Sequence, residues 1–151
     1  MSSPRFVHVH YCDDIRQEIN GKLSLIGCYG PDLVVNQRLP VVLPKLCAMV
    51  FVVTPISTPF RALKVRILRD QELITEIEVP DENFAAMAAD VAEGMRLFQL
   101  SFQFAFAPFA IPEEGVLSVE AQTETELLVG NRLRLRVEPA GLDIGTLADG
   151  Q

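Results

Sequence analysis

The sequence predicts a mainly β protein, an antiparallel β-sandwich of about seven to nine strands with one short crossover helix near residues 82–93. Three observations predict this fold class. Ten prolines divide the 151 residues into short segments, and proline collects at strand ends and in loops because it cannot donate to a ladder. Most segments alternate apolar and polar residues at period two, which is typical of strands. A single segment has helical spacing, which argues against a parallel sheet alternating with long helices.

The first predicted strand covers residues 5–12, where side chains alternate between two faces. Its inner face is expected to carry Val7, Val9 and Tyr11. Its other face carries Phe6, His8, His10 and Cys12. The face that carries the histidines is expected to be the less buried one, on a strand at a sheet edge.

A hairpin is predicted next, because Asn20-Gly21 is a strong signal for a tight turn between two strands. This turn introduces a second strand over residues 22–29, and we expect residues 15–19 to form the strand that pairs with it. The alternative is a single helical turn, capped by Asp13 or Asp14 and ending at the glycine.

Residues 46–54 are apolar on both faces, which indicates a strand buried between two layers. Two strands are then predicted over 62–68 and 73–79, folded about Gln71. This register gathers the apolar side chains on one face and places opposite charges across from each other, Arg66 by Glu76 and Lys64 by Glu78. Because the loop lacks glycine, we expect about three to five residues in it and not a tight turn.

The predicted helix is capped by Asp81 and ends before Gly94, and we expect it to cross over one end or edge of the sheets. The strand that follows, 96–107, shows the clearest alternation in the chain. One of its faces carries Phe98, Leu100, Phe102, Phe104 and Phe106. This stripe is typical of the core face of a central strand; a ligand cavity or a partner interface is the alternative.

Two more strands complete the prediction, over 116–122 and 132–137, with a turn at Gly130-Asn131 before the second. The expected architecture is a single domain over 1–139, an immunoglobulin-like or C2-like sandwich. The remaining residues, 140–151, lose all periodicity and are expected to be a flexible tail.

The composition excludes several classes of protein. Hydrophobic residues make up 49% of the chain, which supplies enough apolar surface to fold and excludes disorder. No stretch of about 18 residues is both apolar and uncharged, so no membrane partner is expected. The formal net charge of −7 repels phosphate, so no nucleic acid partner is expected. Three cysteines without a CxxC pair, and no N-terminal signal peptide, predict a reduced, cytoplasmic protein.

His8 and His10 are the candidate metal ligands, because positions i and i+2 of a strand share a face about 7 Å apart. Cys12 lies about 13 Å along that face, so further ligands would have to come from Asp13, Asp14 or a distant strand. The favoured interpretation is two histidines on a partly exposed strand face, and no cofactor is expected.

Two other groups of residues are candidates for binding. Arg132, Arg134 and Arg136 form a basic stripe at period two that suits an anion, although ion pairs with acids such as Glu120 are favoured by the overall acidity. Phe109 and Ile111, in a proline-flanked loop, are candidates for an exposed contact with a partner. No GxSxG, P-loop, GxGxxG or HExxH motif is present, so no catalytic residue is assigned. A non-enzymatic protein is therefore favoured over an enzyme.

The segment 12–27 reads CDDIRQEINGKLSLIG and resembles a family of small bacterial proteins of unknown function. The members share an Asp-Asp-Ile-Arg stretch, a Gly-Lys turn and a following Ile-Gly strand, and the Leu43-Pro44-Lys45-Leu46 entry into the next strand is similar as well. The resemblance covers about a third of the chain. It implies a bacterial, cytoplasmic origin, and it assigns no activity and no functional residues.

Three functions compete on this evidence. The leading one is a non-enzymatic module for protein interaction or assembly, with another protein or a second copy as partner, because strand edges in an apolar chain must be covered or paired. The second is a small-ligand or metal-binding domain that uses His8 and His10. The third is an anion or nucleic-acid contact through the arginine stripe, which the net charge disfavours.

Overall fold

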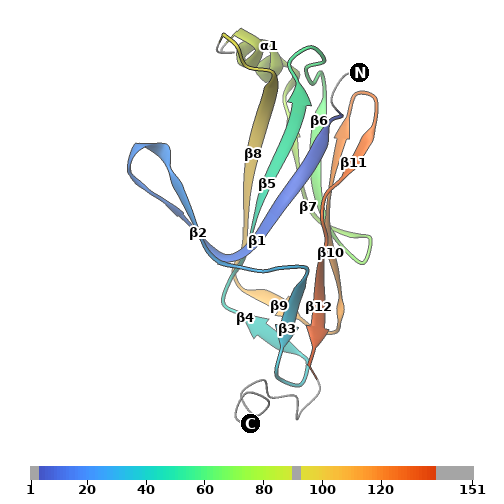
Figure 1. The fold of residues 1–151 in the computed structure, drawn as a ribbon. Coiled ribbons are helices and arrows are strands. Elements are labelled where there is room, and N and C mark those ends of the chain that lie inside the picture. Colours follow the sequence, from blue (N-terminus) through green and yellow to red (C-terminus); the bar gives the residue numbers. More distant parts are fainter. Residues whose placement is uncertain (1–3, 90–92, 139–151) are drawn as a thin grey trace, which may run out of the picture.

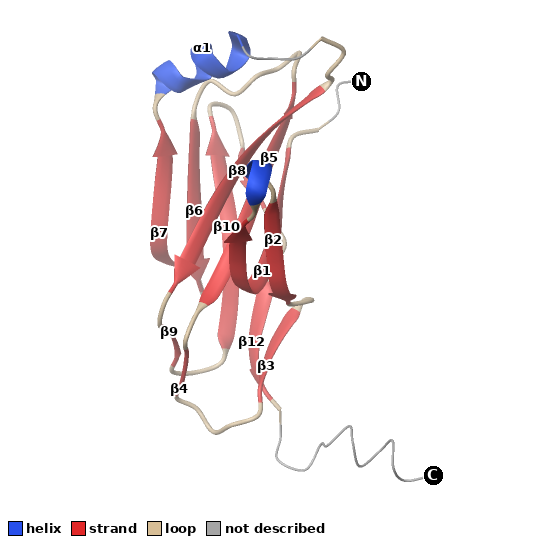
Figure 2. Ribbon diagram, turned by 90° about the vertical axis from the view of Figure 1, so that its left-hand side faces the viewer, coloured by secondary structure: helices blue, strands red, loops and turns tan. Residues whose placement is uncertain are grey.

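The computed structural model describes residues 4–89 and 93–138, and it confirms a mainly β fold in which two sheets pack as a sandwich (Figures 1 and 2). Sheet A has four strands in the order β2 (Leu23–Cys28), β1 (Phe6–Gln17), β5 (Leu46–Pro55) and β8 (Leu97–Phe106). Sheet B has the order β3 (Asp32–Val35), β12 (Leu133–Val137), β10 (Gly115–Thr123), β6 (Leu63–Arg69) and β7 (Glu72–Val79), with β11 (Leu127–Val129) also paired to β10. The tail predicted over 140–151 lies outside the described residues.

The described residues form more strands than expected, twelve in all. The additional ones are short segments in stretches that the sequence presents as loops. Among them, β4 (Val41–Leu43) and β9 (Phe109–Ile111) form a separate two-stranded ribbon. β3 pairs with β12 in parallel, so the sandwich is not purely antiparallel. The chain reaches β3 by crossing from sheet A to sheet B, and it then runs in the same direction as β12.

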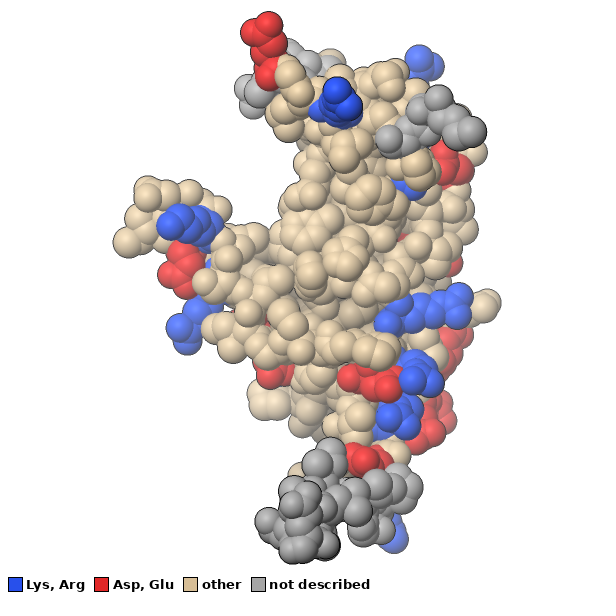
Figure 3. All heavy atoms as spheres, in the orientation of Figure 1, with Lys and Arg blue, Asp and Glu red and all other residues tan. Residues whose placement is uncertain are grey.

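The predicted hairpin is confirmed and its helical alternative is wrong. β1 continues to Gln17, which lies opposite Leu23 of β2. The turn is a single 3-10 turn, η1 (Ile19–Gly21), in which Asn20 and Gly21 have φ of 66° and 73°, the left-handed conformation that such turns require. We call residues 13–28 the arm, because they project from the sandwich (Figures 1 and 3).

β5 is buried along its length except at Phe51, as its two apolar faces predict. Its inner side chains meet those of sheet B in one core, in which Val50, Val65 and Val119 are fully inaccessible to solvent. The phenylalanine stripe of β8 faces the same core. Phe104 is buried and Phe102 is half-buried, because β8 is an edge strand of sheet A and not the central strand that the sequence suggested.

The predicted register of β6 and β7 is confirmed. Lys64 lies opposite Glu78 and Arg66 opposite Glu76, with ion-pair distances of 3.8 and 3.2 Å. The expected longer loop is wrong, because Asp70 and Gln71 make a two-residue turn with φ of 47° and 72°. Aspartate tolerates this conformation, and the Asp70 carboxylate accepts a hydrogen bond of 3.0 Å from the Val116 N–H.

The predicted helix is observed as α1 (Asp81–Ala89). It connects β7 of sheet B to β8 of sheet A and crosses one end of the sandwich (Figure 1). Residues 90–92, in the last part of the predicted helix, lie outside the described residues. Among the described helices, none is long and apolar enough to cross a membrane.

Asn131 closes one long side of the sandwich. Its Oδ1 accepts a hydrogen bond from the Val9 N–H and its Nδ2 donates one to the Val9 carbonyl, both at 2.8 Å. Its own carbonyl accepts a bond of 2.9 Å from the Tyr11 hydroxyl. A Cβ atom at the preceding Gly130 would lie 3.1 Å from methyl groups of Val7 and Val9, which explains the glycine at this close approach. The amide thus substitutes for a neighbouring strand along β1.

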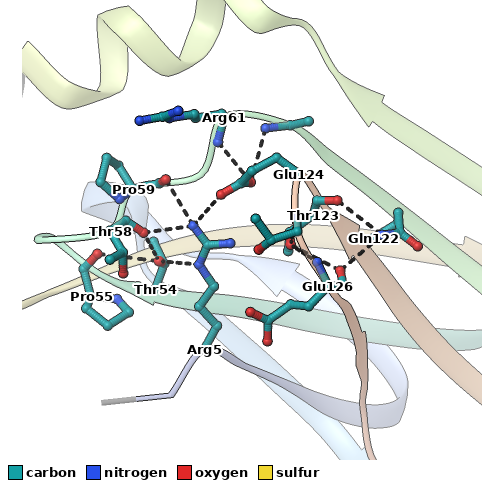
Figure 4. A network of polar contacts seen from close by, with 12 residues as sticks. Arg5, Thr54, Pro55, Thr58, Pro59, Arg61, Gln122, Thr123, Glu124 and Glu126 are labelled. Atoms are coloured by element: carbon teal, nitrogen blue, oxygen red, sulfur yellow. Dashed lines mark hydrogen bonds and ion pairs between the residues drawn. The ribbon is translucent and has the colours of Figure 1, made fainter. Parts of the chain in front are cut away.

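Arg5 anchors the start of β1 on the same side (Figure 4). Its guanidinium donates to Thr54 Oγ1 at 3.0 Å, to the carbonyls of Thr58 and Pro59 at 2.9 and 3.0 Å, and to the Glu124 carboxylate at 2.6 Å. The side chain of Arg5 is only 8% exposed. Burial would raise the pKa of Glu124, but hydrogen bonds from Arg5 and from backbone N–H groups lower it to about 2. We call this set of contacts the Arg5 clamp.

Candidate interaction face

Over residues 6–12 of β1, 47–53 of β5 and 99–105 of β8, the solvent side of sheet A carries no charged residue. The strand register aligns its side chains in four rows: Phe6–Val53–Gln99, His8–Phe51–Ser101, His10–Met49–Gln103 and Cys12–Cys47–Ala105. We call these residues the uncharged face. In the space-filling view, the broad surface in front of these strands shows no Lys, Arg, Asp or Glu (Figure 3). Phe6 is 46% exposed, and Phe51 is half-buried, so aromatic carbon reaches solvent here.

The outer side of sheet B has the opposite character. It carries Lys64, Arg66, Glu76, Glu78, Glu120, Arg134 and Arg136. Most of these charges are paired within the face, as between β6 and β7. Sheet B therefore presents paired charges together with exposed apolar side chains such as Val34 and Val129. The uncharged face instead exposes aromatic and uncharged polar side chains, and Met49, Val53, Cys12 and Cys47 within it are buried.

His8 and His10 lie on the uncharged face and pack against each other. Their ring centroids are 4.5 Å apart at an interplanar angle of 85°, and the His10 ring lies 5.8 Å from Phe51. Burial, and then the neighbouring His8, lower the pKa of His10. Among the described residues, no group of three or more His, Cys, Asp or Glu side chains could hold a metal ion. Two imidazoles do not complete a zinc site, which takes three or four protein ligands, and the metal site stays a prediction.

The three cysteines are brought together, which sequence reasoning missed. Cys12 lies opposite Cys28 of β2 on one side and opposite Cys47 of β5 on the other. All three are free thiols, Cys12 and Cys47 buried and Cys28 exposed. Burial and then the two neighbouring thiols raise the pKa of Cys12 to about 11, and burial raises that of Cys47. Protonated thiols are poor nucleophiles and poor metal ligands. The raised pKa values therefore favour a packing role for these cysteines over a reactive or metal-binding one.

The arginine stripe is partly neutralised by an acid that the sequence did not indicate. Arg134 contacts both carboxylate oxygens of Asp32, at 2.6 and 3.0 Å, and Arg136 lies 3.4 Å from the same carboxylate. The expected acid was Glu120, but Glu120 lies opposite Val129 of β11, whereas Asp32 of β3 lies directly opposite Arg134. Arg132 is exposed and makes no ion pair among the described residues.

Phe109 and Ile111 are not exposed as expected. They are 6% and 1% accessible, while Ala110 between them is exposed. The reason is that β9 pairs with β4, so alternate side chains of this short strand point into the core. These two residues therefore stabilise the sandwich and do not offer an exposed contact.

Comparison with known proteins adds a fold likeness only. No protein-family model matches the chain, and no curated protein is significantly similar in sequence. Among solved structures, the chain is similar to the CARDB domain of a Pyrococcus furiosus protein in complex with di-metal ions. The identity is 12%, the match covers 91% of this chain and 96% of that one, and the TM-score is 0.43. A similarity of this size does not transfer the metal site.

Proposed function

We propose that this protein is a non-enzymatic module for protein interaction or assembly, and that the uncharged face is its docking surface. The observation that supports the proposal is the contrast between the two faces of the sandwich. A continuous face without charge is unusual on a protein whose net charge is −7, and depletion of charged residues together with aromatic side chains is typical of the core of a protein interface.

The chemistry of the face favours a protein partner of matching character. Phe6, His8 and Phe51 supply aromatic area, which is enriched at the centres of interfaces. Gln99, Ser101 and Gln103 supply exposed donors and acceptors along β8. Burying apolar area against a partner stabilises a complex by about 25 cal/mol per Å² before the costs of association.

The proposed compartment is a reducing one, such as the bacterial cytoplasm. All three cysteines are free thiols although Cys12 lies directly opposite the other two. In an oxidising compartment, neighbouring thiols tend to form disulfides.

The test uses two matched substitutions. Phe6→Glu places a carboxylate on the uncharged face, and Ile74→Glu makes the same kind of change at a residue that is similarly exposed, 39%, on β7 of sheet B. A partner is identified by cross-linking in the native host, purified, and titrated calorimetrically against the wild type and both variants.

We expect Phe6→Glu to weaken binding at least tenfold, because the complex would bury an unpaired charge. Ile74→Glu should change the affinity less than twofold. Capture of a partner by itself does not support the proposal; the difference between the variants does. Equal affinity of wild type and Phe6→Glu would show that the uncharged face is not the docking surface.

A further inference from the structure

The free edges of the two sheets are protected in different ways. Edge strands template pairing with other chains unless they are short, charged or bent. β7 carries Glu72, Glu76 and Glu78, and β3 has four residues and begins with Asp32. β2 has six residues and contains a left-handed Gly27, with φ of 67°. β8 has ten residues and contains no charged residue, proline or glycine, so it is the unprotected edge among the described strands.

The backbone of β8 has hydrogen-bonding groups available along this edge. The Arg96 carbonyl accepts a bond of 3.0 Å from the Ile56 N–H, so the backbone groups of residue 96 face β5. In an antiparallel ladder, alternate residues direct both groups to the same side. The N–H and C=O groups that face away from β5 therefore belong to Leu97, Gln99, Ser101, Gln103 and Ala105. In the described part of the chain, no residue bonds to them.

Apolar side chains lie exposed beside this edge. Ile77 on β7 is 38% exposed and Leu97 at the start of β8 is 44% exposed, and Leu100 and Phe102 on the inner side of β8 are half-buried. Figure 2 looks onto this side of the sandwich, where β8 crosses in front of the strands of sheet B. A strand that paired with β8 would cover these side chains as well as the backbone groups.

We infer that β8 pairs in antiparallel fashion with β8 of a second copy of this chain, with the two-fold axis at Ser101. The inference rests on the proposed function, a module for assembly, and it identifies one partner in that assembly as a second copy of the chain. In this register, Ser101 lies opposite its own copy, Gln99 opposite Gln103, and Leu97 opposite Ala105. The two-fold axis repeats the last two pairs, which makes five pairs in all, and each exchanges two hydrogen bonds, about ten in total, so the whole strand is used.

Self-pairing is favoured because β8 is complementary to itself. The register keeps the two inner faces together, with Leu100 opposite Phe102 and Phe98 opposite Phe104 of the second copy. No charge opposes a like charge, since the strand has none. Self-pairing of β7 in the same way would bring glutamates near one another, which destabilises cross-strand pairs.

A cysteine cross-link tests the axis in a Cys28→Ser background, which removes the exposed native thiol. Ser101→Cys places two thiols in a hydrogen-bonded pair, with Cα atoms about 5.5 Å apart and within disulfide range. Gln103→Cys is the matched control, because its copies lie about 14 Å apart along the strands. The double variant Gln99→Cys with Gln103→Cys restores opposed thiols.

We expect Ser101→Cys and the double variant to form covalent dimers on mild oxidation, and Gln103→Cys to form at least tenfold fewer. Without oxidant, size-exclusion chromatography with light scattering should give twice the mass of one chain for the wild type. Ser101→Lys, which opposes two ammonium groups, should weaken the dimer at least tenfold, and circular dichroism shows whether the variant is folded. Gln99→Lys combined with Gln103→Glu places opposite charges across the interface and should keep it.

A wild-type protein with the mass of one chain at millimolar concentration would overturn the inference, as would cross-linking of Gln103→Cys as fast as Ser101→Cys. The two proposals fail separately, because Phe6 lies on β1, the strand beyond β5 from β8. A single-chain mass combined with partner loss in Phe6→Glu removes self-pairing and leaves the docking face. If the wild type is a dimer and the separate protein partner binds Phe6→Glu with wild-type affinity, the docking face is removed and self-pairing remains.

Discussion

The two long sides of this sandwich differ in how far their edge strands are covered by other parts of the chain. On the side of β1 and β11, the Asn131 amide bonds to both backbone groups of Val9, and the Arg5 clamp ties the N-terminal segment to two loops. On the side of β7 and β8, the described residues supply no such contacts along β8, and apolar side chains such as Ile77 and Leu97 reach solvent. One side is closed within the chain and the other is left open.

The difference shows what closing a sheet edge requires. An edge strand needs a donor and an acceptor at the spacing of a neighbouring backbone, and a single asparagine amide provides both. β8 has no such substitute nearby, and its own side chains carry no charge that would keep another strand away. The open side is therefore suited to a second chain, whereas the closed side stabilises the monomer.

The largest expected effect comes from the closed side. Arg5→Met removes hydrogen bonds to four groups and leaves the Glu124 carboxylate without its cation. We expect the free energy of unfolding to fall by roughly 3 kcal/mol, measured by urea denaturation. Arg38→Met, at an exposed loop position, is the control and should change it by less than about 0.5 kcal/mol. A loss below about 1 kcal/mol in Arg5→Met would show that the clamp is not a major source of stability.

Asn131→Ala should have the next largest effect. It leaves the N–H and C=O of Val9 without partners in a part-buried position, which costs roughly 2 kcal/mol. Asn36→Ala, in an exposed loop, is the matched control. Hydrogen exchange of the Val9 amide should accelerate in Asn131→Ala and not in the control. An unchanged exchange rate would contradict the role assigned to the amide.

A pH titration separates the charge of Glu124 from its packing. Because its folded pKa is about 2, below the ordinary 4.5, the carboxylate stabilises the fold fully above pH 4.5 and loses that contribution as the pH falls towards 2. We expect the wild type to lose roughly 1 kcal/mol relative to Glu124→Gln across this window, since the pair is partly screened by solvent. Parallel stability curves for the two proteins would refute the electrostatic role of the pair.

The smallest effect is expected on the open side. Ile77→Thr should change the free energy of unfolding by less than about 1 kcal/mol in the Ser101→Lys background, because the side chain already contacts water. Val9→Thr, the comparable substitution on the closed side, buries a hydroxyl at a position 2% exposed and should cost roughly 2 kcal/mol. Similar losses in the two variants would mean that the sides do not differ in packing.

Much of the fold could be predicted from local pattern. The alternation of apolar and polar residues located the main strands, and the pairing of Arg66 with Glu76 set a register that the structure confirms. Asn20 and Gly21 located the hairpin correctly. The two-residue turn at Asp70 and Gln71 was missed, because both residues adopt the left-handed conformation and neither is the glycine that usually signals a tight turn.

The candidate site was harder to predict, because it depends on which strands are neighbours. His8 was placed correctly on an outer face, yet nothing local showed that Phe51 and Ser101 would lie beside it. The burial of Phe109 and Ile111 follows from the pairing of two three-residue strands, which are too short to show a pattern. The row of cysteines likewise appears only once β1 lies between β2 and β5.

The sequence by itself determined the two-faced character of each strand, including the uncharged ten-residue run of β8. Alternation is a local property of extended backbone, so it can be read along the chain. Only the tertiary structure decided that three such faces join into one surface, that Asn131 closes the side along β1, and that β8 lies at an edge. These features come from contacts between segments far apart in sequence, where the order of the strands, and not any local preference, selects the neighbours.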